Sequence, residues 1–154
     1  MAEKSKLRQR GESKVNIIRF LHRKTESPFL YDYKTVQQAL RFMRSHGYRE
    51  IPVVSQDGLY LGAVDEGDFL WHVLDYGGYE AVKDDKIGAF VCRGRIPALK
   101  ITASDEELMQ AILRAAFVPI VDDRDVFVGV VDRTDVAQYF IDKARASAPS
   151  VVTA

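Results

Sequence analysis

One internal duplication constrains this chain more than any other feature of its sequence. Residues 51–54 read IPVV and residues 62–68 read GAVDEGD, and the same pattern returns as VPIV at 118–121 and GVVDRTD at 129–135. Pro52 and Pro119 lie 67 positions apart (119 − 52), and the glycines and final aspartates of the pattern keep that offset. A duplication of this kind predicts two copies of one supersecondary unit that share a core.

Each copy carries the signals of an α/β unit. In the first, extended residues 29–31 precede a helix that begins after Thr35, where Gln38 completes a capping box, and that ends at Gly47. Residues 51–54 and 59–64 form a hairpin through an Asp-Gly turn, and residues 66–74 form a second helix. The first copy is therefore predicted to fold in the order β-α-β-β-α.

The second copy repeats this order. Residues 98–101 are extended, and Ser104 begins a second capping box with Glu107. Strands are expected at 118–121 and 126–131, with a closing helix over 134–146. We therefore divide the chain into a polar N-terminal segment with an extra helix over 13–23 (1–27), a first motif (28–75), a connector with a short helix near 84–90 (76–95), a second motif (96–142), and a helix end with a tail (143–154).

Composition excludes several classes of protein. The 22 basic and 22 acidic residues balance, so bulk electrostatics favour neither nucleic acid nor an acidic membrane surface as a partner. No apolar run approaches the roughly 18–20 residues of a membrane span, and the N-terminus lacks the apolar core of a signal peptide. Cys92 is the only cysteine, so no internal disulfide can form. These features predict a soluble, cytoplasmic protein.

The duplicated β-α-β-β-α order resembles the CBS domain, and residues 28–142 resemble a tandem CBS pair, or Bateman module. The likeness extends to small stand-alone bacterial CBS-pair proteins, some of which bind cyclic di-AMP, through HGYREIP at 46–52 and AFVP at 116–119. The resemblance implies two α/β motifs related by pseudo-twofold symmetry. It also implies clefts between them for AMP, ATP, S-adenosylmethionine or cyclic dinucleotides, and a homodimer.

Asp68 and Asp135 each stand in the first turn of a helix that follows a strand. A carboxylate there can accept hydrogen bonds from the two ribose hydroxyls, which is the role that the resemblance implies for both. The structural alternative is a carboxylate that complements the N-terminus of its own helix.

Asp65 and Asp132 stand where the family usually has Thr or Ser. A hydroxyl can donate to phosphate, whereas a carboxylate accepts only and repels it. This substitution favours a neutral nucleoside edge, a cation or no ligand, or simply a solvated turn. Arg133, beside Asp132, can bind phosphate through paired donors or form an ion pair with Asp132, whereas the first copy has Glu66 at that position.

Five further positions complete the candidate set. Thr134 could donate to phosphate, but its position favours a helix cap. Tyr48 and Phe117 precede the central strands, where the resemblance places adenine contacts, and for Phe117 core packing is the favoured alternative. Arg93 and Arg95 form a basic pair in the connector that either reaches a cleft or is solvated.

No other chemistry is indicated. The three histidines show no metal-ligand spacing, and no nucleophile–base set or glycine-rich phosphate loop is present. Trp71 and Tyr76 fit a dimer interface or a core. The sequence therefore predicts a non-enzymatic homodimer that requires no cofactor, senses an adenine nucleotide by population shift and signals to a protein partner. The alternative is a scaffold that needs no ligand.

Overall fold

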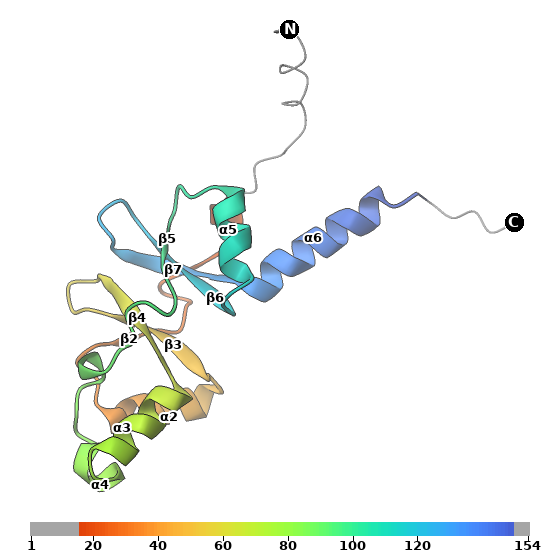
Figure 1. Cartoon of the computed structure of the whole chain (residues 1–154). Coiled ribbons are helices and arrows are strands. Elements are labelled where there is room, and N and C mark those ends of the chain that lie inside the picture. Colours follow the sequence, from red (N-terminus) through yellow and green to blue (C-terminus); the bar gives the residue numbers. More distant parts are fainter. Residues whose placement is uncertain (1–15, 150–154) are drawn as a thin grey trace, which may run out of the picture.

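The computed structural model describes residues 16–149 (Figure 1). Its elements in chain order are α1 (Ile17–Phe20), β1 (Leu21–Arg23), β2 (Leu30–Tyr31), α2 (Val36–His46), β3 (Glu50–Val54), β4 (Tyr60–Asp65), α3 (Glu66–Asp75), α4 (Tyr79–Val82), the 3₁₀ helix η1 (Ile87–Ala89), β5 (Leu99–Lys100), α5 (Asp105–Ile112), β6 (Phe117–Val121), β7 (Phe127–Asp132) and α6 (Arg133–Ser147). The predicted order β-α-β-β-α occurs twice, as β2-α2-β3-β4-α3 and β5-α5-β6-β7-α6.

The two copies have the same topology. In each, a short first strand pairs in parallel with the central strand, which then forms an antiparallel hairpin with the third. Pro52 stands opposite Ala63 and Pro119 opposite Val130, and both central strands carry a register irregularity at the equivalent step. The duplicated α/β architecture is therefore confirmed, and the two repeats also share the register of their strand pairs.

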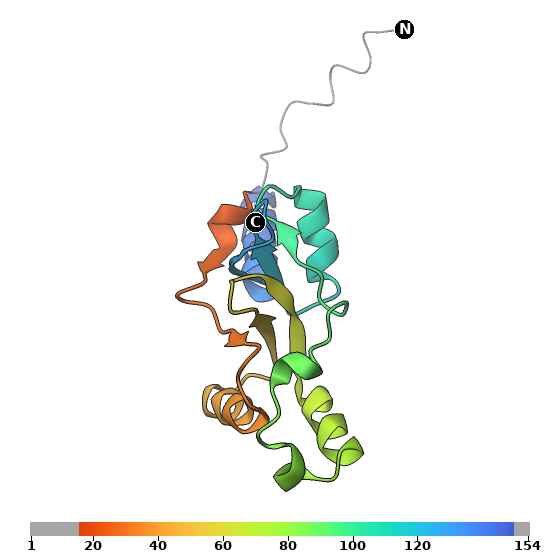
Figure 2. The same cartoon turned by 90° about the vertical axis from the view of Figure 1, so that its left-hand side faces the viewer.

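Three apolar clusters hold the molecule together. One lies between the first sheet and its helices, and a second lies between the second sheet, α1, α5 and α6. The third joins the repeats, with Val54, Phe127 and Val130 buried at its centre. Burial on both faces explains why residues 51–54 and 118–121 read as continuous apolar runs. In Figures 1 and 2 the two sheets stand one above the other, and α6 projects from the body.

The extra helix predicted over 13–23 is confirmed only at Ile17–Phe20 and is wrong for Leu21–Arg23. Asn16 caps a single turn, and the chain then becomes β1, which pairs antiparallel with β7. This pairing satisfies backbone groups of β7 that would otherwise form an open edge. The second sheet therefore has four strands, in the order β1-β7-β6-β5, whereas the first has three. Residues 13–15 lie outside the described part.

The connector also differs from the prediction. Gly77 and Gly78 take positive φ after α3, and a short helix that was not predicted follows at Tyr79–Val82. Residue Lys86 is extended and bridges to Thr35, which leaves only the 3₁₀ turn Ile87–Ala89. Further on, Cys92 bridges to Ala63, so the connector flanks β4 as β1 flanks β7.

None of the helices in residues 16–149 combines the length and the apolar character that a membrane crossing requires.

Candidate functional site

The two aspartates that replace hydroxyl residues are helix caps. Asp65 accepts a hydrogen bond from the Asp68 N–H at 2.8 Å, and Asp68 accepts from the Asp65 N–H at 2.8 Å, which is a reciprocal capping box for α3. Asp132 caps α6 by accepting from the Thr134 N–H at 3.0 Å. The expectation that the Thr134 hydroxyl caps this helix is therefore wrong, because the Asp132 carboxylate takes that position.

The helix-start aspartates at the predicted ribose positions both have side-chain partners. Asp135 lies 2.5 Å from His22 Nε2, which β1 brings to α6. Asp68 accepts hydrogen bonds from the Arg95 guanidinium. Partial burial opposes ionisation of Asp68, but the hydrogen bonds from Arg95 and from the Asp65 backbone outweigh it and lower the pKa of Asp68. Both carboxylates thus already have a side-chain partner in this conformation, while Asp135 stays 46% exposed.

Arg95 also contacts two further carboxylates. Its Nε lies 3.1 Å from Glu50 Oε2, and one terminal nitrogen lies 3.1 Å from Asp65 Oδ2. Burial raises the pKa of Glu50, with Arg95 acting in the opposite direction. The sequence offered Arg95 only as half of a basic pair, with solvation as an alternative. The structure instead places its guanidinium among three carboxylates.

A cavity of about 400 Å³ lies between the repeats, and we call it the Arg133 cleft. It brings together five predicted site residues, namely Tyr48 from the first repeat and Phe117, Asp132, Arg133 and Thr134 from the second. Asp65, Asp68 and Asp135 do not line it. The remaining wall is formed by His22, Glu26, Pro28, Gly47, Arg49, Glu50, Pro52, Ala116 and Val130.

Two arginines from opposite repeats face the Arg133 cleft. Arg49 precedes β3, and Arg133 begins α6. Within residues 16–149 neither forms an ion pair, so the alternative in which Asp132 neutralises Arg133 is not adopted. Glu26, Glu50 and Asp132 also line the wall, and Glu50 is in addition a partner of Arg95. Arg49 was missed from the sequence, although a basic residue directly before a repeat's central strand was the available signal.

The predicted aromatic residues are partly accessible. Tyr48 stacks on His46 with ring centroids 5.8 Å apart and packs on the first core, and Phe117 packs on the cluster between the repeats. Both side chains are half-buried and also line the cleft. Phe117 therefore combines the core packing favoured for it with a position where a base could stack, and base stacking stays a prediction.

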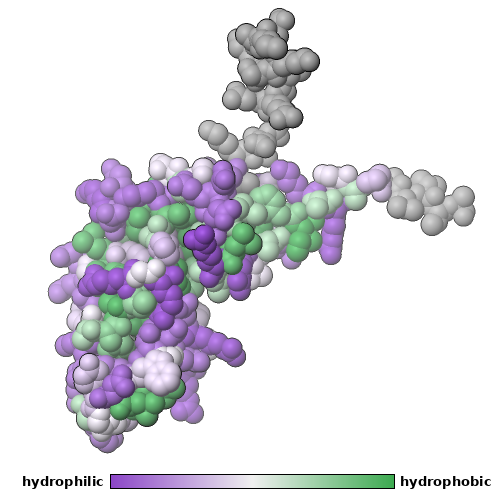
Figure 3. All heavy atoms as spheres, viewed as in Figure 1, coloured by the Kyte–Doolittle hydropathy of each residue, from purple (hydrophilic) through white to green (hydrophobic). Residues whose placement is uncertain are grey.

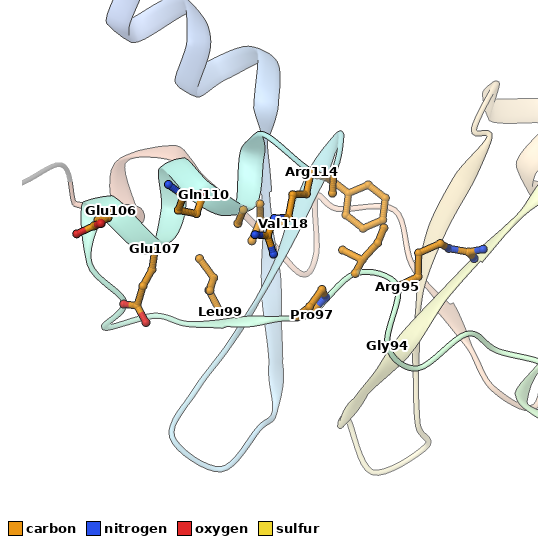
Figure 4. Close-up of a pocket in the computed structure, with 13 residues that line it drawn as sticks. Gly94, Arg95, Pro97, Leu99, Glu106, Glu107, Gln110, Arg114 and Val118 are labelled. Atoms are coloured by element: carbon orange, nitrogen blue, oxygen red, sulfur yellow. The ribbon is translucent and has the colours of Figure 1, made fainter.

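A second hollow of about 500 Å³ lies between the end of the connector and α5, and we call it the α5 groove (Figure 4). Its floor is largely apolar and includes Leu99 and Val118, with Arg114 beside them. The Arg95 side chain points away from this floor, toward the strands of the first repeat. At the 67-residue offset of the repeat, Asp65, Glu66 and Gly67 correspond to Asp132, Arg133 and Thr134 of the Arg133 cleft, and Asp65 is an ion-pair partner of Arg95. We call the site around Asp65 and Arg95 the first cleft.

Comparison with known proteins agrees with this architecture. The sequence model of the CBS domain matches residues 24–75 and 87–142, so the chain belongs to the CBS-domain family and carries two CBS repeats. Among curated protein sequences none matches the chain. The class defined by fold and clefts is thus the CBS pair.

Solved structures of stand-alone CBS-pair proteins share the fold. A CbpB structure in complex with c-di-AMP has a TM-score of 0.78 at 16% identity, covering 86% of this chain and 88% of its own. Listeria monocytogenes CbpB in complex with c-di-AMP has a TM-score of 0.77 at 18% identity, covering 86% and 100%. A CBS domain protein from Streptococcus pneumoniae has a TM-score of 0.76 at 17% identity, covering 84% and 88%.

Proposed function

We propose that this chain is a non-enzymatic regulatory protein that binds an adenine-containing nucleotide in the Arg133 cleft. One observation carries the proposal: Arg49 and Arg133, from different repeats and without carboxylate partners in residues 16–149, line one cavity with two half-buried aromatic side chains. Guanidinium groups suit phosphate oxygens, and aromatic rings suit a purine face. A ligand held by both arginines would bridge the two repeats.

Cyclic di-AMP is the ligand that this arrangement favours. It carries two phosphates and two adenines, which matches two arginines and two aromatic walls. Two of the structural relatives are CbpB proteins in complex with c-di-AMP, which supports the same choice. AMP, ATP and S-adenosylmethionine each present one adenine, and they remain the alternatives that an experiment must separate.

The proposed mechanism is a shift of population. A ligand that contacts Arg49 and Arg133 favours the relative position of the repeats in which both contacts form. That position fixes the surface offered to a regulated protein in the bacterial cytoplasm. The chemistry needs no cofactor and no bond breaking, in line with the absence of an evident nucleophile–base set in the sequence.

A thermal-shift screen with the four nucleotides tests the proposal. A specific ligand at about 100 times its Kd stabilises the folded state by about 2.7 kcal/mol. For a chain of 154 residues this corresponds to a rise in Tm of roughly 5–10 °C. We expect the largest rise with cyclic di-AMP. No rise with any of the four would contradict the sensor function and leave the scaffold as the better reading.

We further propose that the protein is a homodimer formed through α3 and the segment that follows it. Leu70, Trp71, Leu74 and Tyr76 have exposed fractions of 52%, 61%, 62% and 66%, so Trp71 and Tyr76 are not core residues. Figure 3 shows apolar side chains gathered at this end of the molecule and along α6. Exposed large apolar side chains gathered on one helix are typical of an interface.

Trp71→Glu is expected to convert the dimer into a monomer. A charged side chain in a buried interface would lose its hydration without a partner. Light scattering coupled to size-exclusion chromatography measures the mass, for which the protomer is 17.4 kDa. Ile18→Glu is the control, because Ile18 is similarly exposed at 59% but lies on α1. A wild-type protein that elutes as a monomer at micromolar concentration would overturn this assembly.

A further inference from the structure

We infer that the Arg95 side chain of this chain occupies the first cleft. Its ion pairs fix the connector to the first repeat, which we call the lock, and they leave the Arg133 cleft as the nucleotide site. The lock itself follows from contacts within the chain. Only the restriction to one nucleotide site rests on the proposed function.

The Arg95 guanidinium is matched to its surroundings. Glu50 comes from β3, Asp65 from the end of β4 and Asp68 from α3, and each nitrogen of the guanidinium is paired with a different carboxylate. A terminal nitrogen also donates to the Ala63 carbonyl at 3.4 Å. Asp68 is the residue predicted to accept ribose hydroxyls, so the guanidinium takes the hydrogen bonds that a ribose would need.

The backbone holds Arg95 from both sides. Before it, Cys92 and Ala63 exchange hydrogen bonds of 3.0 and 3.2 Å. After it, Ile96 is buried, and its carbonyl accepts a hydrogen bond from the Tyr60 hydroxyl at 2.6 Å. The side chain is 32% exposed and points to the first repeat rather than into the α5 groove (Figure 4). Little entropy is therefore lost when the ion pairs form.

The equivalent position of the second repeat is built differently. Asp135 contacts the His22 imidazole, and no described arginine occupies that place. The first cleft thus sets three carboxylates against one guanidinium, an excess of negative charge that repels phosphate. The Arg133 cleft offers two unpaired guanidinium groups instead. The two unpaired guanidinium groups therefore favour an anionic ligand at the second site, although Glu26, Glu50 and Asp132 line it as well.

Chemical rescue tests the lock without any nucleotide. Arg95→Ala removes the guanidinium but leaves the carboxylates, so millimolar ethylguanidinium chloride should raise the Tm of this variant by several degrees in a saturable way. Ethylamine hydrochloride at equal ionic strength is the control for charge alone, and wild type should not respond. The double variant Arg95→Ala, Asp68→Asn should lose most of the response. An Arg95→Ala variant that folds and gives no saturable response would overturn the inference.

A second variant covers the case in which Arg95→Ala does not fold. Arg95→Met keeps the apolar stem, and its loss of Tm relative to wild type should be largest at pH 7 and shrink toward pH 3.5. Asp68 has a lowered folded pKa, so its stabilising effect is present above its unfolded value of about 3.9 and is lost as the pH falls through the folded pKa. Burial raises the pKa of Glu50, but Arg95 stabilises its ionised form, so the contact between Arg95 and Glu50 is also lost as the pH falls and shrinks the difference in the same direction. Asp65 and Tyr60 are the other titratable groups beside Arg95. A loss of Tm that does not depend on pH would indicate that Arg95 contributes through packing alone.

Calorimetry with cyclic di-AMP tests the restriction to one site. We expect one molecule of cyclic di-AMP per protomer in the wild type, and weaker binding by Arg95→Met, because Glu50 lines the Arg133 cleft and loses its Arg95 partner in that variant. Two molecules per protomer in the wild type would overturn the inference. Absence of all nucleotide binding would contradict the proposed function, while the rescue and the pH profile would still decide whether Arg95 is a lock.

Discussion

Replacement of Arg49 and Arg133 together by alanine is expected to weaken cyclic di-AMP binding by about 100-fold. Each guanidinium would donate charge-assisted hydrogen bonds to phosphate, which contribute about 1.5–3 kcal/mol each, and 1.4 kcal/mol is a tenfold change in Kd. The single variants should each lose about tenfold. Isothermal titration calorimetry measures all three, and the loss should appear mainly in Kd with little change in Tm of the free protein.

The control variant removes the same charge elsewhere. Arg124 lies in the second hairpin with its side chain 80% exposed, and it does not line the Arg133 cleft. Arg124→Ala should keep wild-type affinity, within the small change that net charge causes through long-range electrostatics. A double variant of Arg49 and Arg133 that still binds with wild-type affinity would show that the phosphates lie elsewhere, and the site assignment would be wrong.

Much of the fold could be predicted from the sequence because the same pattern of elements occurs in both repeats. Thr35 and Ser104 cap their helices as predicted, and Gly47 ends its helix in the left-handed conformation. The misread segments are those that occur once. Residues 17–23 have an apolar stripe typical of a helix, but Leu21–Arg23 form β1 because β7 offers backbone partners. A tertiary contact of this kind leaves no local signal in the sequence.

The same limit applies to the candidate site. Tyr48, Phe117, Arg133 and Thr134 were found because each occupies a defined place in its repeat, and the structure gathers them at one cavity. The partners of Asp68 and Asp135 were not found, since Arg95 and His22 come from the connector and from β1. The equivalent aspartates of the two repeats therefore have different partners, because those partners come from segments outside the repeat.

This difference also explains the substituted positions. Asp65 and Asp132 replace a hydroxyl residue in both copies, which predicted poor phosphate binding at both clefts. Asp65 is engaged by its capping box and by Arg95, so the first cleft fits that prediction. Asp132 is engaged by the Thr134 N–H, and Arg49 and Arg133 supply positive charge at the same cavity. The second cleft can therefore accommodate an anion despite the substitution.

Gly129→Ala is expected to cause the largest loss of stability among the glycine-to-alanine replacements in the described residues. Gly129 has φ +156°, and a Cβ there would lie 2.0 Å from the His22 carbonyl oxygen. That oxygen belongs to backbone, so β1 must move away from β7 to relieve the contact. Strain and overpacking of this kind cost about 2–4 kcal/mol, which urea denaturation followed by circular dichroism can measure.

Gly94→Ala provides the matched control, because a Cβ at Gly94 would meet no atom within 4 Å. Its free energy of unfolding should stay within about 0.5 kcal/mol of wild type. Gly62→Ala should behave like Gly129→Ala, since its Cβ would lie 2.4 Å from the Cys92 carbonyl oxygen at the equivalent point of the first repeat. A loss below about 1 kcal/mol for Gly129→Ala would mean that β1 yields easily. A β1 strand that moves easily would not hold His22 against Asp135, and this contact would then not explain why the two clefts differ.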